Sequence, residues 1–249
     1  MIITTDIDFK KFNFPCGEPH IRIDNVKSSF TDIVFEFEKS EEILDLLLLC
    51  NAAKEQGIKI RNLTIPYVPF GRQDRVAERG DSFSLKVFSQ LVNSIEADKV
   101  VVYDPHSDVT TVLIDRCEIV NQYDILNYVF KNKNDFYLIC PDGGALKKIY
   151  KLATSLNCVS VVECTKIRDT KTGKILGSHV YADNLDGKDC YIADDICDGG
   201  ATFIGIAKEL RKLNCGKIIL AVTHGFFTKG LQVFDGLIDE IYTRKGRIK

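Results

Sequence analysis

The stretch that decides the fold runs from Tyr191 to Phe203 and reads YIADDICDGGATF. It begins as an apolar run, passes through two aspartates and two glycines, and continues into apolar residues with helical spacing. A strand, a glycine turn and a helix N-terminus in this order form an anion site, because the first helical N–H groups lack partners inside the helix. The aspartates would repel a bare phosphate, and they suit the hydroxyls of a ribose whose phosphate binds at the turn.

The same stretch has a simpler interpretation, an acidic strand-to-helix loop with a threonine N-cap. Two common nucleotide-binding patterns are absent from it, since no Gly-Lys-Ser/Thr follows the turn and the glycines lack the G-x-G-x-x-G spacing. On this stretch alone both interpretations stay open.

The composition is that of an ordinary globular protein, with 249 residues, 45% of them hydrophobic and 27% charged. A formal net charge of -2 argues against a protein that mainly coats nucleic acid or a membrane surface. The N-terminal residues lack the basic region and apolar core of a signal peptide, and no apolar run is long enough to cross a bilayer. The nine cysteines are scattered without a C-x-x-C pair, which predicts reduced thiols, a cytoplasmic location and no zinc site.

Strand and helix patterns alternate along the chain. Apolar runs predict strands, and amphipathic spacing predicts helices; the strands are 20–23, 33–37, 58–67, 99–103, 136–140, 159–162, 191–193 and 218–222, and the helices are 40–57, 82–97, 143–156 and 202–213. This order predicts an α/β fold of two packed, doubly wound parallel-sheet halves, residues 1–133 and 134–249, with a seam near Asn132. Ligands bind at the carboxyl ends of the strands in such folds.

Four further segments place polar residues just past predicted strand ends. Residues 71–75 offer two guanidinium groups for phosphate oxygens or a base, and residues 104–106 offer a carboxylate and an imidazole. Residues 141–144 repeat the acid-glycine order, and residues 165–168 carry a lysine and an arginine before a polar turn, which predicts a mobile cationic flap. Each segment alone can be a solvated loop or a capped turn, but their shared position at strand ends favours one binding site.

The order of these motifs resembles that of the ribose-phosphate diphosphokinase (phosphoribosyl pyrophosphate synthetase) family. Residues 14–18 are similar to its Phe-Ser-Asp-Gly-Glu turn, and residues 66–75 to its Pro-Tyr-x4-Arg-Gln-Asp-Arg segment. Residues 104–106 resemble its Asp-Leu-His, residues 141–144 its Pro-Asp-x-Gly-Gly, and residues 194–202 its phosphoribose loop. The resemblance extends from about Phe14 to Tyr242, and it implies that both halves are phosphoribosyltransferase-like.

The resemblance implies an enzyme in which the anomeric hydroxyl of a 5-phosphorylated ribose attacks the β-phosphorus of Mg-ATP and AMP leaves. It also implies a homo-oligomer, a dimer or a hexamer, with an ATP pocket shared between subunits. The residues that would bind ATP are Arg72, Gln73, Asp74 and Arg75, with Phe14 and Glu18 reaching the adenine from a neighbouring subunit.

The remaining roles follow from the same resemblance. His106 and Asp142 would sit at Mg2+, with His106 also counted as catalytic, and Lys166 and Arg168 would close on the transferring group. The residues expected to bind the ribose hydroxyls are Asp194 and Asp195, and those expected around the phosphate are Asp198, Gly199, Gly200, Ala201 and Thr202.

Several positions depart from the family pattern. Gly199 stands where the family has a threonine and Ala201 where it has a glycine, so the loop loses a hydroxyl donor and becomes roomier at one position. Cys16 replaces an acid in the first turn, and the sequence ends before the family's usual last strand and helix. From these changes we expect ADP-ribose as the acceptor, giving ADP-ribose pyrophosphate in NAD salvage, with ribose 5-phosphate as the alternative.

Two other classes remain to be weighed, a non-catalytic regulatory relative and a phosphoribosyltransferase. The first usually loses flap or metal residues, whereas this chain keeps His106, Asp142, Lys166 and Arg168. The second has no need of the segment from Arg72 to Arg75. We therefore rank both below an ATP-dependent diphosphokinase.

Overall fold

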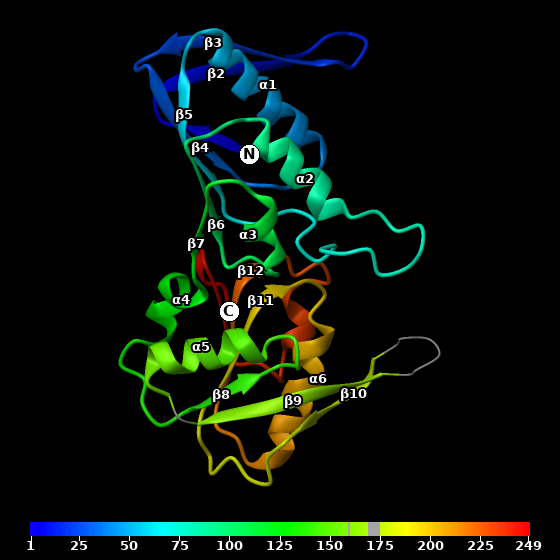
Figure 1. The fold of residues 1–249 in the computed structure, drawn as a ribbon. Coiled ribbons are helices and arrows are strands. Elements are labelled where there is room, and N and C mark those ends of the chain that lie inside the picture. The colour runs from blue at the N-terminus through cyan, green and yellow to red at the C-terminus, as the bar shows by residue number, and fades with distance from the viewer. Residues whose placement is uncertain (159, 169–174) are drawn as a thin grey trace. The chain divides into compact units, whose positions relative to one another are not determined.

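The computed structural model describes residues 1–158, 160–168 and 175–249, and the side chains of residues 167, 168, 175 and 176 lie outside that description. The chain forms two compact units, Met1–Val120 and Asn121–Lys249 (Figure 1). The division falls earlier in the chain than the seam predicted near Asn132. The reason is helix α4 (Gln122–Phe130), whose Leu126 and Val129 pack in a core of the second unit.

The first unit is built on a five-stranded sheet with the strand order β1-β4-β5-β6-β7. Strands β4 to β7 are parallel, and β1 joins β4 as an antiparallel edge. The elements of this sheet and its helices are β1 (Ile2–Thr4), β4 (Phe30–Phe35), α1 (Glu41–Glu55), β5 (Lys59–Ile65), α2 (Ser84–Asn93), β6 (Lys99–Tyr103), α3 (Val109–Leu113) and β7 (Cys117–Val120). A separate antiparallel hairpin consists of β2 (Ile7–Asn13) and β3 (Pro19–Val26).

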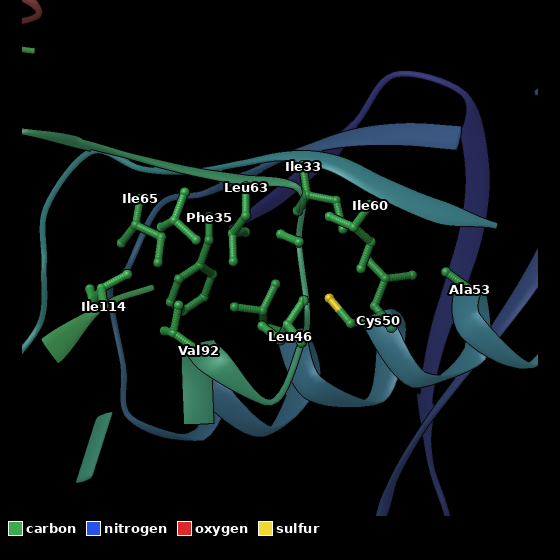
Figure 2. Packing of buried hydrophobic residues seen from close by; sticks show 14 of the residues in the cluster. Ile33, Phe35, Leu46, Cys50, Ala53, Ile60, Leu63, Ile65, Val92 and Ile114 are labelled. Atoms are coloured by element: carbon green, nitrogen blue, oxygen red, sulfur yellow. The ribbon is translucent and has the colours of Figure 1, made fainter. Parts of the chain in front are cut away.

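The core of the first unit lies where one face of this sheet meets the helices. Along β4 and β5 burial alternates, so that Ile33 and Leu63 are fully covered whereas Val34 and Thr64 are only partly covered. Figure 2 shows the strand side chains above Leu46, Cys50 and Ala53 of α1. The apolar spacing of this helix therefore sets which face of the sheet it covers.

The second unit contains a seven-stranded sheet with the order β10-β9-β8-β11-β12-β13-β14. Its five central strands are parallel, and β10 and β14 are antiparallel edges. The remaining elements are β8 (Tyr137–Cys140), α5 (Leu146–Leu156), β9 (Val161–Arg168), β10 (Ile175–Val180), β11 (Cys190–Cys197), α6 (Ala201–Leu210), η1 (Arg211–Leu213), β12 (Ile218–Gly225), η2 (Leu231–Phe234), β13 (Glu240–Thr243) and β14 (Gly246–Arg247).

Both faces of this second sheet carry a core. Ile192 and Leu220 point to one face, where they pack with Phe203 and Ile206 of α6. The alternate residues of the same strands, among them Tyr191, face the other cluster, which α4 and α5 complete. A helix on each face of a parallel sheet is the doubly wound arrangement, and the predicted α/β class with parallel sheets is confirmed.

Around the deciding stretch, two local features differ from the sequence expectations. Strand β11 continues to Cys197 rather than ending at Ala193, and α6 ends at Leu210 before a 3-10 turn. The residues of the predicted flap lie on β9, which pairs antiparallel with β10, and the polar turn at residues 169–173 lies outside the described residues. Among the described helices, none combines the length and apolar character that a membrane crossing requires.

Candidate active site

The two aspartates of the deciding stretch lie inside strand β11 rather than after it. Strand β8 pairs with β11 only at residues 190–192, whereas β12 accompanies β11 as far as Cys197. Asp194 and Asp195 therefore lie in the part of β11 that extends beyond its pairing with β8. The Gln122 side chain of α4 donates a hydrogen bond of 2.7 Å to the Asp194 carbonyl oxygen and so ties that helix to this segment.

The carboxylates of this pair are close to one another and to a lysine. The Asp195 N–H donates to Asp194 Oδ1 at 2.9 Å, and Lys148 Nζ lies 3.5 Å from Asp195 Oδ2. Burial and the neighbouring Asp195 charge raise the pKa of Asp194 well above its ordinary value, and the Asp142 charge adds to this effect. The raised pKa favours the protonated form of Asp194, so the pair carries less than two negative charges while its carboxyl oxygens stay able to bind hydroxyl groups.

Asp142 lies in the turn after β8, at the same edge of the sheet. Its Oδ1 accepts the N–H groups of Gly144 at 2.9 Å and Ala145 at 3.2 Å, and its Oδ2 is paired with Lys166 Nζ. Burial would raise the pKa of Asp142, but the Lys166 ammonium and the two N–H groups outweigh it and hold the pKa below its usual value. Asp142 is therefore a carboxylate, and the strand that carries Lys166 reaches it.

The predicted flap residues lie on β9. Lys166 is paired in register with Ser178 of β10, and its side chain is mostly covered. Arg168 ends the strand, and its side chain lies outside the described part of the chain. Of the two flap cations, only Lys166 can therefore be placed at the carboxylates.

The predicted phosphate loop joins β11 to α6. Gly200 is the N-cap of the helix with φ +79°, and a Cβ there would meet Phe234 Cζ at 2.4 Å, so this position requires glycine. Ala201 and Thr202 form the first turn of the ten-residue helix, and Asp198 is exposed and accepts a 2.8 Å hydrogen bond from Thr228 Oγ1. The strand, glycine turn and helix N-terminus predicted from sequence are thus present.

The open position predicted at Gly199 has a lysine beside it. A side chain built there would meet Lys229 Cε at 3.3 Å and Cδ at 3.4 Å. The methylene groups of a lysine from the segment after β12 therefore lie against Gly199, a contact that the spacing of the loop motif does not reveal.

In the first unit, the loops after β5 and β6 come together. A Cβ on Gly71 would lie 3.5 Å from His106 Cβ, and Ser107 donates a hydrogen bond to the Asp74 carboxylate. The Arg75 guanidinium donates to both Asp74 oxygens, at 2.7 and 2.9 Å, and this fork with Ser107 lowers the pKa of buried Asp74 to about 2. The sequence motifs at residues 71–75 and 104–106 are therefore neighbours in space.

This cluster presents mainly exposed donors. Arg72, Gln73 and His106 are exposed, whereas the Arg75 fork is already engaged by Asp74. Of the two arginines predicted to bind phosphate oxygens, Arg75 is thus held by a carboxylate of its own chain. The structure assigns Arg75 a positioning contact that the sequence pattern did not predict.

Phe14 and Glu18 lie in the turn between β2 and β3. Gly17, with φ +94°, closes this turn, and the Phe14 N–H donates to the Glu18 carbonyl oxygen at 2.9 Å. In Figure 1 the turn lies well apart from the loop that follows β5 in the same unit. Within one chain, these two residues are not brought to the Arg72–Arg75 segment.

Sequence reasoning missed Lys148, Gln122 and Lys229. Lys148 follows the acid-glycine turn in the first turn of α5, a position that could have been flagged as the helical face next to the strand ends. Gln122 and Lys229 lie in segments with no chemical motif, so no sequence signal distinguished them.

Comparisons with known proteins agree with this architecture. Residues 121–233 match the phosphoribosyl transferase domain family. The chain is 30% identical over 244 residues to a ribose-phosphate pyrophosphokinase of Pyrococcus furiosus, an alignment that covers 95% of this chain and 84% of that protein. It is 28% identical over 247 residues to the enzyme of the same name from Thermococcus kodakarensis, with coverage of 95% and 84%.

A solved structure shows the same fold. The phosphoribosylpyrophosphate synthetase of Mycobacterium smegmatis superposes with a TM-score of 0.80 at 23% identity, covering 95% of this chain and 80% of that one. The fold and the acid-glycine site thus define a two-unit α/β protein with a phosphoribosyl transferase-type second unit. The chain belongs to the ribose-phosphate pyrophosphokinase family, and it is a diphosphotransferase.

Proposed function

We propose that this enzyme transfers a diphosphoryl group from Mg-ATP to the anomeric hydroxyl of ribose 5-phosphate and releases AMP. The observation that carries the proposal is the 30% identity, over 84% of its length, to a relative named ribose-phosphate pyrophosphokinase. The Asp142–Lys166 pair and the glycine turn before α6 support it, because both fit a reaction between highly charged phosphate groups.

The reaction joins the anomeric oxygen to the β-phosphorus of ATP. The bond between the β-phosphorus and the oxygen that bridges to the α-phosphorus breaks, that oxygen leaves on AMP, and the hydroxyl proton is released. Such transfers depend on positioning and on neutralising charge more than on covalent catalysis by the protein. Lys166 is the cation whose position best fits this role.

Each unit contributes a different set of residues to the proposal. In the first unit, Arg72, Gln73 and Asp74 bind the nucleotide, with Arg75 holding Asp74 in place. In the second unit, Asp194 and Asp195 accept hydrogen bonds from the ribose hydroxyls. The residues that surround the 5-phosphate are Asp198, Gly199, Gly200, Ala201 and Thr202.

Mg2+ is the proposed cofactor, and the donor set fits it. Mg2+ is a hard cation that is held by one or two carboxylates together with substrate phosphates and water. Asp142 is an ionised carboxylate, and among the described residues no three His, Cys, Asp or Glu side chains form a ready-made metal cage. His106, the other residue predicted at Mg2+, is exposed. When bound, the ion would neutralise charge on the triphosphate.

Ribose 5-phosphate replaces ADP-ribose as our first acceptor. The sequence argument for ADP-ribose depended on the changes at Gly199 and Ala201 and on the early end of the sequence, and Lys229 lies against the open position at Gly199. The names of the relatives point to a ribose phosphate. ADP-ribose stays in the assay as the second candidate, since it presents the same ribose hydroxyls and a phosphate on the same carbon.

The test is AMP release from Mg-ATP with ribose 5-phosphate, ADP-ribose, ribose or no acceptor. We expect AMP and a new anomeric diphosphate, seen by phosphorus NMR, with ribose 5-phosphate. AMP release with ADP-ribose alone would make ADP-ribose the acceptor. Acceptor-independent hydrolysis of ATP, or no AMP with any acceptor, would refute the proposal.

We further propose that the β2–β3 turn serves the ATP site of a second copy. Phe14 lies at this turn with Phe12 and His20, the ring centroids being 5.0–5.8 Å apart, and Phe14 is 47% exposed. Exposed aromatic rings of this kind suit stacking on an adenine. Light scattering should give a dimer or a hexamer, and Phe14→Ala should raise the KM for ATP.

A further inference from the structure

The segment after β12 is tied across the predicted phosphate loop. The Phe226 N–H donates to the Cys197 carbonyl oxygen at 2.8 Å, and the Thr228 N–H donates to the Asp198 carbonyl oxygen at 3.2 Å. Thr228 Oγ1 also donates to Asp198 Oδ1 at 2.8 Å. These three bonds fix the residues around Thr228 beside the loop that precedes α6.

Lys229 is placed by these bonds against the backbone of Gly199. A Cβ at Gly199 would lie 3.3 Å from Lys229 Cε, 3.4 Å from Cδ and 3.6 Å from Cγ, so the aliphatic part of the lysine covers the glycine. The ammonium is one covalent bond beyond Cε. In the described part of the chain this ammonium makes no ion pair with a carboxylate, and the residue is exposed. Its charge is therefore available to a ligand at the loop.

The loop itself has few side-chain donors. Gly199 and Gly200 have no side chain, and Ala201 has no polar group. The N–H groups of the first turn of α6 supply directed hydrogen bonds to an anion, but a phosphate monoester carries up to two negative charges. A lysine is a compact cation that binds phosphate as a point charge. Lys229 adds such a charge beside Gly199, where the absence of a side chain leaves room for the lysine chain.

We propose that Lys229 binds the phosphoryl group on the 5-carbon of the ribose and that Gly199 is the partner that lets it do so. The proposal rests on the proposed function, because it assigns a residue to the acceptor phosphate of that reaction. A Cβ at residue 199 would lie in tight contact with the Lys229 methylene groups, so a side chain there would push the lysine away from the loop. Compared with the family loop, this chain therefore lacks the threonine hydroxyl at residue 199 and has instead the Lys229 ammonium from the neighbouring segment.

The test separates the effect of the Lys229 charge from the effect of its methylene contacts. Lys229→Met keeps the methylene contacts with Gly199 and removes the ammonium, and Lys229→Arg keeps a cation. The control is Lys208→Ala, which removes an exposed lysine from α6 and changes the net charge equally. A double variant, Gly199→Thr with Lys229→Ala, returns a hydroxyl to the loop and vacates the space it needs.

We expect Lys229→Met to raise the KM for ribose 5-phosphate about tenfold, the loss of one charge-assisted hydrogen bond. The kcat and the KM for ATP should stay within about twofold, because the group acts on the acceptor alone. Lys229→Arg should recover most of the affinity, the double variant part of it, and Lys208→Ala should behave as the unmodified enzyme. An unchanged KM for ribose 5-phosphate in Lys229→Met would overturn the proposal.

Calorimetric titration without ATP separates this proposal from the reaction. Ribose 5-phosphate, ADP-ribose and ribose serve as ligands, so that a phosphate monoester, a diphosphate esterified at both ends and an unphosphorylated sugar are compared. Weaker binding of either phosphorylated ligand to Lys229→Met, with ribose unaffected, supports the role of Lys229 even if no AMP is formed. An equal loss of affinity for ribose, or no binding of any phosphorylated ligand by the unmodified enzyme, refutes the proposal.

Discussion

Lys148 Nζ lies 3.5 Å from Asp195 Oδ2, and so the first turn of α5 brings a cation to the aspartate pair of β11. The Asp195 side chain is only 7% exposed, and the Lys148 side chain is 29% exposed. Two adjacent carboxylates at a buried strand repel one another, and burial raises the pKa of Asp194. The ammonium offsets part of that repulsion, which makes Lys148 a positioning residue for the pair.

Replacing Lys148 should change the pH dependence of the reaction. A nearby cation favours the ionised form of a carboxylate, so Lys148→Met should raise the pH at which the pair loses its protons. We expect the acid limb of the kcat/KM profile to move to higher pH by about one unit, which is typical of a partly exposed contact. The profile is measured by AMP release with saturating Mg-ATP.

Two further variants control this prediction. Lys148→Arg keeps the charge and should keep the acid limb in place. Lys151→Ala removes a lysine of the same helix whose ammonium donates to the Asn121 side-chain oxygen at 2.6 Å. An acid limb that stays fixed in Lys148→Met, or that moves equally in Lys151→Ala, would show that Lys148 does not act on the pair.

Lys166 is expected to act on the rate of transfer. Removing its ammonium in Lys166→Ala deprives the transferring group of a cation and lets burial raise the pKa of Asp142. We expect kcat to fall by about 100-fold or more, as for loss of one transition-state donor, while ATP binding changes little. Rapid-quench measurement of AMP formation, together with equilibrium binding of ATP, separates the two effects.

The matched variant is Lys166→Arg, which retains a cation on β9 and should keep more of the rate. Near-normal kcat in Lys166→Ala would remove Lys166 from the reaction. A rise in the ATP dissociation constant that accounted for the whole loss would make it a nucleotide-binding residue instead.

Much of the fold could be predicted from the order of apolar runs. The runs at residues 58–67, 99–103 and 191–193 all became parallel strands, because buried parallel strands have continuous apolar sequences. The extension of β11 through Asp194 and Asp195 could not be predicted in the same way. Carboxylates are rare in strands, and these are tolerated because β8 has ended beside them and leaves one side of β11 without a neighbouring strand.

The residues of the candidate site that belong to sequence motifs could be predicted, whereas the single lysines near them could not. Asp142 and the glycine turn at Gly200 stood in recognisable patterns after strands. Lys148 and Lys229 contact residues that are distant in the chain, so only the folded structure pairs them with Asp195 and Gly199. Long-range pairing of ordinary surface residues is the part of a site that sequence patterns do not encode.

The cysteines should differ sharply in reactivity. Burial raises the pKa of Cys140 to about 11 and those of Cys50, Cys164, Cys190 and Cys197 to about 12, so their thiolates are scarce at neutral pH. Cys16 is exposed in the β2–β3 turn. Iodoacetamide at pH 7.5 should label Cys16 in the folded protein and leave these five unmodified, as read by peptide mass spectrometry. The Cys16→Ser variant should lose the rapid labelling. In urea all thiols should react. Rapid labelling of Cys140 or Cys164 in the folded protein would contradict their burial.

Asp74 should stabilise the protein in a way that depends on pH. The Arg75 fork, with a hydrogen bond from Ser107, lowers the pKa of this carboxyl from 3.8 to about 2, so the folded state favours the ionised form. The resulting stability is present above about pH 4 and is lost as the pH falls through that range toward 2. Because Arg75 is 75% exposed, solvent screens the pair, and we expect Asp74→Asn to lower the free energy of unfolding by about 1 kcal/mol at pH 7.

Urea unfolding followed by tyrosine fluorescence at pH 7 and at pH 2.5 measures this dependence. The difference between the unmodified protein and Asp74→Asn should shrink at the lower pH, because the carboxyl is then largely protonated in the unfolded chain and part of its advantage is gone. Asp98→Asn, at an exposed position of the same unit, should leave the midpoint unchanged at both pH values. A difference that persisted undiminished at pH 2.5 would mean that Asp74 contributes through packing and neutral hydrogen bonds rather than through its charge.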